Sequence, residues 1–232
     1  MINSIFNLFI FYLFYLLFFV ATFGYGKLIN SLLQINKKNF NYFEIVFYGL
    51  IFYLILGFLF YTIFGNNYYL NFLVLIFGLW LFFNENIEKK IFLKKIIFFL
   101  TILFSGLLIS KTHEDFPLYH FFSVQQIFEN NLTIGLPLVN FRFVHASLLS
   151  YVQSLYVLPF FNYKLIHLPV YFIYLSSIGY FLYQLTLTKN KLERFFCFFL
   201  VTVFLVKLQI PPEYQPQSGL GVPFWRISIW MA

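Results

Sequence analysis

The segment FEIVFYGLIFYLILGFLFYTIFG, from Phe43 to Gly65, decides the class of fold. Its one charged residue is Glu44, which lies next to the start of the run. The hydrocarbon core of a bilayer is about 30 Å thick, and a helix needs roughly 20 apolar residues to cross it. Backbone polar groups inside lipid must be satisfied within the segment, so this run predicts a transmembrane helix.

Five more apolar runs flank this one along the chain. Hydrophobic residues make up 61% of the sequence and charged residues 10%, whereas a soluble domain is about half apolar and about a quarter charged. The runs are continuous rather than alternating, which argues against a transmembrane β-barrel. We therefore predict an all-α, polytopic transmembrane protein with about six spans. The other five spans are expected at about 5–24, 69–84, 92–110, 165–186 and 195–210.

The basic residues predict how the spans are oriented. The formal net charge is +7, and most Lys and Arg residues lie in alternate short loops. Such loops stay on the cytoplasmic side, so the N-terminus and residues 111–164 are expected on the extracytoplasmic side. The predicted partner is the lipid bilayer, and no nucleic-acid role is assigned to the positive charge. The loop cations are Lys27, Lys37, Lys38, Lys89, Lys90, Lys94, Lys95, Lys189, Lys191 and Arg194.

Four regions follow from this topology. Residues 1–110 hold four spans with short loops, residues 111–164 form one long extracytoplasmic segment, and residues 165–210 hold two further spans. A connection as long as 111–164 is uncommon without a function, and its content of Phe, Leu and Tyr argues against disorder. Residues 211–232 are rich in Pro and Gly, and we expect either a solvated tail or the edge of a truncated chain.

The long segment is predicted to contain interfacial helices. Pro117 suits the first turn of a helix, and the acids before it suit the positive N-terminal end. The pattern after it is amphipathic until Gly135 and Pro137 break it, as in helices that lie along a membrane surface. A second apolar stretch, about 144–158, ends at Pro159. The first helix is expected to place Leu118, Phe121, Phe122 and Phe128 on its apolar side, and His120, Ser123, Gln126 and Asn130 on another side.

The candidate chemistry lies in KTHEDFP, Lys111 to Pro117, after the fourth predicted span. Charged groups near hydrocarbon are costly, which favours a functional reason for the cluster. Asp115 or Glu114 could act as a general base toward a hydroxyl, and nearby cations could stabilise a phosphate leaving group. The alternative is that the cluster only marks a water-exposed boundary and caps the next helix. The predicted substrate-binding residues are Lys111, His113, His120, Arg142 and His145.

No cofactor is expected from the remaining patterns. His113, Glu114 and His120 match no standard spacing of metal ligands, so we predict no metal site. Cys197 is the single cysteine, which excludes an intrachain disulfide and a Cys-based metal site.

A wider pattern accompanies the acidic motif. The run THEDFPLYH, Thr112 to His120, is followed by Gly135, Asn140, Arg142, His145, Ser147 and the Leu158–Pro159 pair. This pattern resembles uncharacterised bacterial multi-pass inner-membrane proteins of surface-polysaccharide loci, whose shape is similar to GT-C glycosyltransferases. The resemblance implies location in the bacterial inner membrane and a polyprenyl-phosphate sugar donor. It also implies that Asp115 or Glu114 deprotonates the acceptor.

The expected function is cell-envelope polysaccharide assembly, with glycosyltransferase activity as the leading candidate. Two alternatives stay open. A flippase or polymerase component that moves or joins lipid-linked glycans would need polar residues within the spans, and the first three runs hold almost none. A non-catalytic membrane scaffold would tolerate substitution throughout residues 111–145.

Overall fold

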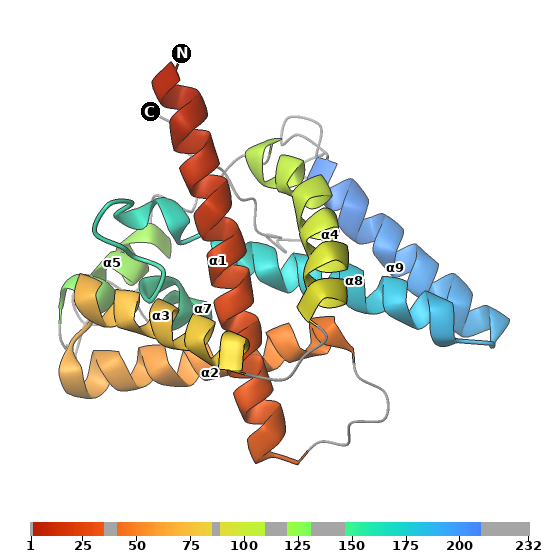
Figure 1. Cartoon of the computed structure of the whole chain (residues 1–232), viewed down its shortest axis with the longest axis horizontal. Coiled ribbons are helices and arrows are strands. Elements are labelled where there is room, and N and C mark those ends of the chain that lie inside the picture. Colours follow the sequence, from red (N-terminus) through yellow and green to blue (C-terminus); the bar gives the residue numbers. More distant parts are fainter. Residues whose placement is uncertain (1, 35–40, 85–88, 110–119, 131–146, 210–232) are drawn as a thin grey trace, which may run out of the picture.

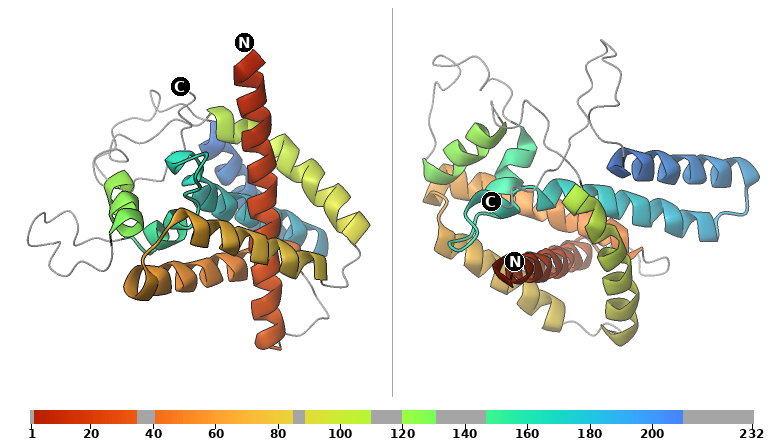
Figure 2. Two further views of the ribbon diagram at one scale, coloured as in Figure 1. Left: turned by 60° about the vertical axis from the view of Figure 1, so that its left-hand side comes forward. Right: turned by 90° about the horizontal axis from the view of Figure 1, so that it is seen from above.

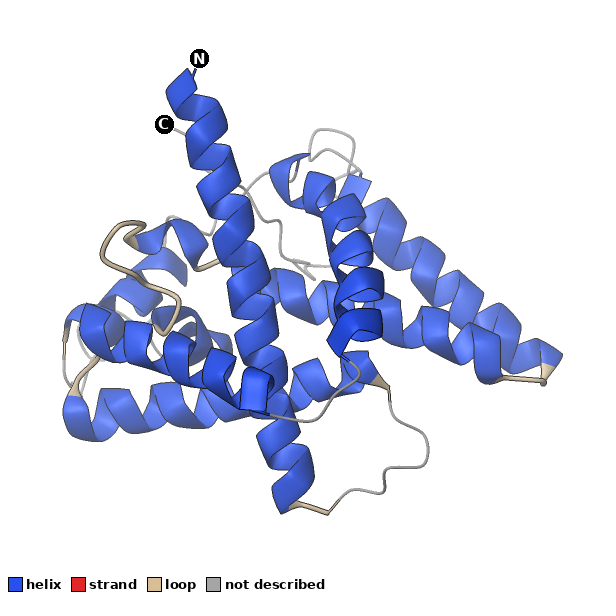
Figure 3. Cartoon of the chain, in the orientation of Figure 1, coloured by secondary structure: helices blue, strands red, loops and turns tan. Residues whose placement is uncertain are grey.

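A computed structural model of the chain describes residues 2–34, 41–84, 89–109, 120–130 and 147–209. Within these ranges every regular element is a helix (Figure 3), and the only strand-like pairing is an isolated bridge between Leu158 and Asn162. A π-helical turn, Phe60–Phe64, extends α2, and a 3₁₀ turn, Tyr163–Leu165, precedes α8. The predicted all-α class is confirmed. The α-helices are α1 (Ile2–Leu32), α2 (Tyr42–Leu59), α3 (Tyr68–Asn84), α4 (Lys89–Ile109), α5 (Phe121–Glu129), α7 (Leu148–Ser154), α8 (Leu168–Leu187) and α9 (Lys191–Gln209).

Several of these helices have the length and composition of membrane spans. Among the described residues, three segments are long and apolar enough to cross a membrane: Ile5–Leu32, Tyr42–Phe64 and Tyr163–Leu187. They correspond to the first, second and fifth predicted spans. Helix α3 and the apolar part of α4, Ile96–Leu108, are shorter. The chain is therefore a helical protein suited to a membrane, and six spans remain a prediction.

Helix α1 is the centre of the arrangement. It packs on α2 and α3 through its C-terminal half and on α4 through its N-terminal half. Figure 1 shows α1 standing steeply in the view and crossing α2, α3 and the start of α8, while α9 lies to the right beside α8, and the view from above in Figure 2 looks along α1. Membrane spans usually tilt by about 20° from the bilayer normal, with a range of about 0–40°. The described helices thus do not form a simple bundle of parallel spans.

The crossing of α1 and α2 depends on two glycines. A Cβ atom on Gly49 would overlap the backbone carbonyl of Thr22, and a Cβ atom on Gly26 would overlap the backbone carbonyl of Ile45. Small residues let helix backbones approach closely, and such packing drives helix association where water is absent. These two positions therefore specify where α1 and α2 cross.

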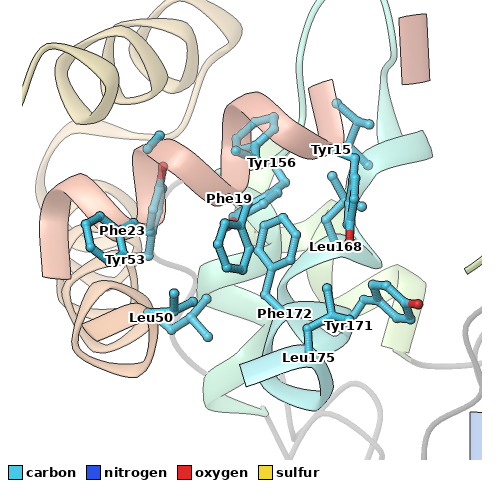
Figure 4. Packing of buried hydrophobic residues seen from close by; sticks show 14 of the residues in the cluster. Tyr15, Phe19, Phe23, Leu50, Tyr53, Tyr156, Leu168, Tyr171, Phe172 and Leu175 are labelled. Atoms are coloured by element: carbon cyan, nitrogen blue, oxygen red, sulfur yellow. The ribbon is translucent and has the colours of Figure 1, made fainter. Parts of the chain in front are cut away.

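The core that surrounds α1 is largely aromatic. Phe18 stacks on Tyr156 with ring centroids 4.2 Å apart, and the rings of Tyr15 and Phe172 lie 5.7 Å apart. All four side chains are buried. Such aromatic pairs add about 0.5–1.5 kcal/mol beyond the burial of their area. Figure 4 shows how side chains from α1, α2, α8 and the segment after α7 meet in this core.

Two tyrosine hydroxyls link α4 to α1 and α8 by hydrogen bonds. Tyr15 of α1 donates a hydrogen bond of 3.2 Å to the carbonyl of Leu100, and Tyr171 of α8 donates to the carbonyl of Leu103. A buried hydroxyl without a partner is unfavourable, so tyrosine inside an apolar core needs such an acceptor. The two bonds fix the position of α4 relative to α1 and α8.

Candidate functional site

Most of the residues predicted to carry chemistry lie outside the described part of the chain. The exception is His120, which directly precedes α5; its backbone is helical and its side chain is partly exposed. The roles assigned to the other six residues stay predictions. Those six, in residues 110–119 and 131–146, are Lys111, His113, Glu114, Asp115, Arg142 and His145.

Helix α5 belongs to the segment that was expected to be amphipathic. Its buried residues are Val124, Ile127 and Phe128, which share one face because they are three and four residues apart. Phe122, which was predicted on the side that faces the membrane, is 51% exposed on the protein surface, so its contact with lipid stays a prediction. The buried side is selected by contact with α7 and with Tyr163, which a single helix pattern does not contain.

Three side-chain amides, those of Asn66, Asn71 and Gln153, join the described parts of the long segment to the α2–α3 turn, to α3 and to the entry of α8. We call them the amide cluster. Asn66 lies in the turn between α2 and α3, and its Nδ2 donates to the carbonyl of Ile127 at 3.2 Å and to the hydroxyl of Ser154 at 3.1 Å. One side chain therefore contacts both α5 and α7.

Asn71 is the most buried member of the amide cluster. It lies in α3 with no exposed surface, and its Nδ2 donates to the carbonyls of Ser154 at 2.8 Å and Val157 at 2.9 Å. Helix α7 ends at Ser154, and the last carbonyls of a helix have no donor within the helix. Asn71 supplies a shorter bond from a neighbouring helix, beside a bond of 3.4 Å that the Ser154 carbonyl accepts from the backbone N–H of Val157.

Gln153 links α7 to the start of α8. Its Nε2 donates to the carbonyl of Ile166 at 3.0 Å, and the side chain is buried. Ile166 closes the 3₁₀ turn that leads into α8. The amide cluster therefore holds α5, α7 and the entry to α8 against the turn between α2 and α3.

Glu129 is the acidic side chain that the structure describes within residues 111–164. Its carboxylate accepts a hydrogen bond of 2.6 Å from the Tyr163 hydroxyl and bonds of 3.1 and 3.0 Å from Gln125 Nε2. Glu129 is exposed, and Gln125 and Tyr163 are partly buried. The carboxylate therefore holds the end of α5 to the 3₁₀ turn.

A pair of hydroxyl groups joins α1 to the segment after α7. Thr22 donates to the carbonyl of Phe18 at 2.7 Å, so Tyr156 is the donor in the 3.1 Å bond that joins the two hydroxyls. Burial raises the pKa of Tyr156 well above its ordinary value. The phenol therefore stays protonated and serves as a structural donor.

Sequence reasoning did not single out the amide cluster. Asn71 stands inside the apolar run 69–84, where an unpaired amide would be unfavourable, and that cost was the available signal. Gln153 and Ser154 carried no comparable signal, because polar residues are ordinary in a segment expected outside the bilayer.

The side chains of the amide cluster hold the backbone of the protein itself in place rather than a substrate. Amide donors meet carbonyl acceptors, and within the described ranges no group of three His, Cys, Asp or Glu side chains could hold a metal ion. The described residues thus build a scaffold of hydrogen bonds between helices. No family model matches this chain, and no curated protein or solved structure matches it either.

Proposed function

We propose that this chain is an integral inner-membrane protein of cell-envelope polysaccharide assembly that acts as a GT-C-like glycosyltransferase. The observation that carries the proposal is the amide cluster. Side chains of the α2–α3 turn and of α3 bind backbone on both sides of residues 131–146, at Ile127 and at Ser154. A long extracytoplasmic segment that presents catalytic groups has to be held against the membrane helices, because a loosely tethered acid would be poorly oriented.

The contacts agree with the expected topology. The α2–α3 turn has no Lys or Arg, and positive-inside counting put it on the same side as residues 111–164. Asn66 in that turn bonds Ile127 and Ser154 of the long segment. Two segments assigned to one side by charge are therefore in direct contact, which supports the orientation.

The proposed reaction uses the predicted motif. Asp115 or Glu114 takes the proton of an acceptor hydroxyl as its oxygen attacks the anomeric carbon of the donor sugar. The bond from that carbon to the phosphate oxygen breaks, and the polyprenyl phosphate leaves with the electron pair. Lys111 and Arg142 are expected to stabilise the charge on the departing phosphate.

The test replaces each predicted base without changing its size. In a complemented deletion strain, Asp115→Asn or Glu114→Gln is expected to abolish surface glycan, and transfer by purified protein to fall by about 10²–10⁴-fold. Glu129→Gln is the matched control, because Glu129 is an acid of the same segment that bonds Tyr163. Wild-type glycan in both the Asp115 and Glu114 variants would remove the catalytic proposal.

A non-catalytic membrane scaffold is the second candidate. It is favoured by one observation: every described member of the amide cluster bonds the protein itself. A scaffold predicts that substitutions across 111–119 leave function intact while Asn71→Leu impairs it. The enzyme predicts that both impair it, so a substitution scan with a glycan readout separates the two.

A further inference from the structure

The turn between α8 and α9 gathers three cations at one end of a helical hairpin. Lys189, Lys191 and Arg194 are all exposed. None of them forms an ion pair with a carboxylate among the described residues, and the nearby Glu193 accepts a hydrogen bond of 3.3 Å from Asn190 instead. The turn therefore presents positive charge that the described fold does not neutralise.

Hydrogen bonds hold this turn in a defined shape. The Asn190 side chain accepts from the backbone N–H of Leu192 at 3.0 Å, which caps the start of α9. Arg194 Nη2 donates to the carbonyl of Thr188 at 2.8 Å, so its guanidinium closes the end of α8. The two lysines are thus displayed on an ordered turn.

An apolar face continues from the cations along α9. One side of α9 packs on α8, where Phe204 stacks on Phe181 with ring centroids 6.2 Å apart and Val201 is buried. Aromatic residues beyond the turn point away from α8, with exposed fractions between 53% and 67%. They are Phe195, Phe196, Phe198 and Phe199.

We propose that this hairpin end binds the headgroups of anionic phospholipids, with the phosphates on Lys189, Lys191 and Arg194 and the acyl chains against the exposed phenylalanines. A soluble anion would match only the cations, whereas a lipid matches both features, with a negative head for the cations and an apolar tail for the exposed phenylalanines. The site is separate from the proposed glycosyltransferase motif and does not depend on it. Each lysine near such a surface contributes about fivefold in affinity.

The experiment uses the full-length chain purified in detergent. Binding of phosphatidylglycerol and of phosphatidylcholine is measured by native mass spectrometry for the wild type and for Lys189→Gln/Lys191→Gln. Arg194 is kept because it closes the turn. Lys164→Gln is the control, since Lys164 is another exposed lysine near the end of a described helix. The Lys189→Arg/Lys191→Arg variant keeps the charge.

The proposal expects the wild type to prefer phosphatidylglycerol and the Gln double variant to bind it about 25-fold more weakly. Lys164→Gln and the Arg double variant should bind as the wild type does, and 0.5 M salt, with a Debye length of roughly 4–5 Å, should reduce the preference. Equal binding of the two lipids by the wild type would overturn the proposal. So would unchanged affinity in the Gln double variant, or displacement of the lipid by inorganic phosphate alone at equal affinity.

Discussion

Asn71 shows how one polar residue can organise a largely apolar protein. It lies in the middle of an apolar helix, yet its side chain is fully buried and bonds two carbonyls at the end of α7. An unsatisfied amide in such surroundings costs about 1–3 kcal/mol on protein scales. In Asn71 the Nδ2 group is satisfied by two carbonyls, whereas the Oδ1 atom has no hydrogen-bond partner among the described residues. The Nδ2 group of Asn71 is therefore tolerated because residues 147–157 place two carbonyl acceptors beside it.

Replacing Asn71 by Leu should weaken the fold although the new side chain is apolar and of similar size. The substitution leaves the carbonyls of Ser154 and Val157 without this donor, and we expect a loss of about 1–3 kcal/mol in the free energy of unfolding. Denaturant titration in micelles measures the change.

Thr202→Val is a suitable control for that measurement. Its hydroxyl is exposed and bonds the carbonyl of Phe198 in its own helix. The control should lie within about 0.5 kcal/mol of the wild type. An Asn71→Leu protein as stable as this control would show that the two bonds contribute nothing.

The helices are held together mainly by close backbone contacts at the points where they cross. Helices α1 and α2 meet where Gly26 faces Ile45 and Gly49 faces Thr22, and there the backbones are in direct contact. Lipid offers no hydrophobic force between helices, so such packing has to come from shape. Exposed positions on the same helices, such as Ile55, carry no such constraint.

Gly49→Val tests this crossing. The added side chain would collide with the backbone carbonyl of Thr22, which cannot move without displacing α1. We expect a loss of at least about 1–3 kcal/mol in stability, measured as a lower midpoint of thermal unfolding in detergent. Ile55→Val, on an exposed part of α2, is the control and should leave the midpoint nearly unchanged. A stable Gly49→Val protein would contradict the packing described.

At the scale of the whole molecule, the steep passage of α1 across α2, α3 and α8 is the main architectural feature (Figures 1 and 2). Helices that cross in this way cannot all stand near one bilayer normal. At least one of the long apolar helices is therefore strongly inclined to the others.

Sided labelling tests the orientation of the molecule. Cys197 is the only cysteine, so a Cys197→Ala background can carry Tyr69→Cys near the α2–α3 turn or Lys189→Cys in the α8–α9 turn. Both positions are exposed. Positive-inside counting predicts that an impermeant thiol reagent added to intact cells labels position 69 and not position 189. Labelling of both positions from the same side would reject the topology.

The site and the fold were predictable to different extents. Apolar length and the absence of internal charge indicated the runs that became Ile5–Leu32 and Tyr42–Phe64, because helix formation in lipid depends on local backbone bonding. The same reasoning did not identify Val124 and Ile127 as part of the buried side of α5, because burial there depends on α7 and Tyr163.

By itself, the sequence determined the helical class, the apolar segments and the alternation of basic loops. These depend on composition and on contacts between residues close along the chain. The tertiary structure alone decided that Asn71 bonds Val157, that Gly49 meets Thr22 and that α1 crosses its neighbours steeply. Those features join residues far apart in sequence, and their energies come from shape and hydrogen-bond geometry that exist only after the helices have packed.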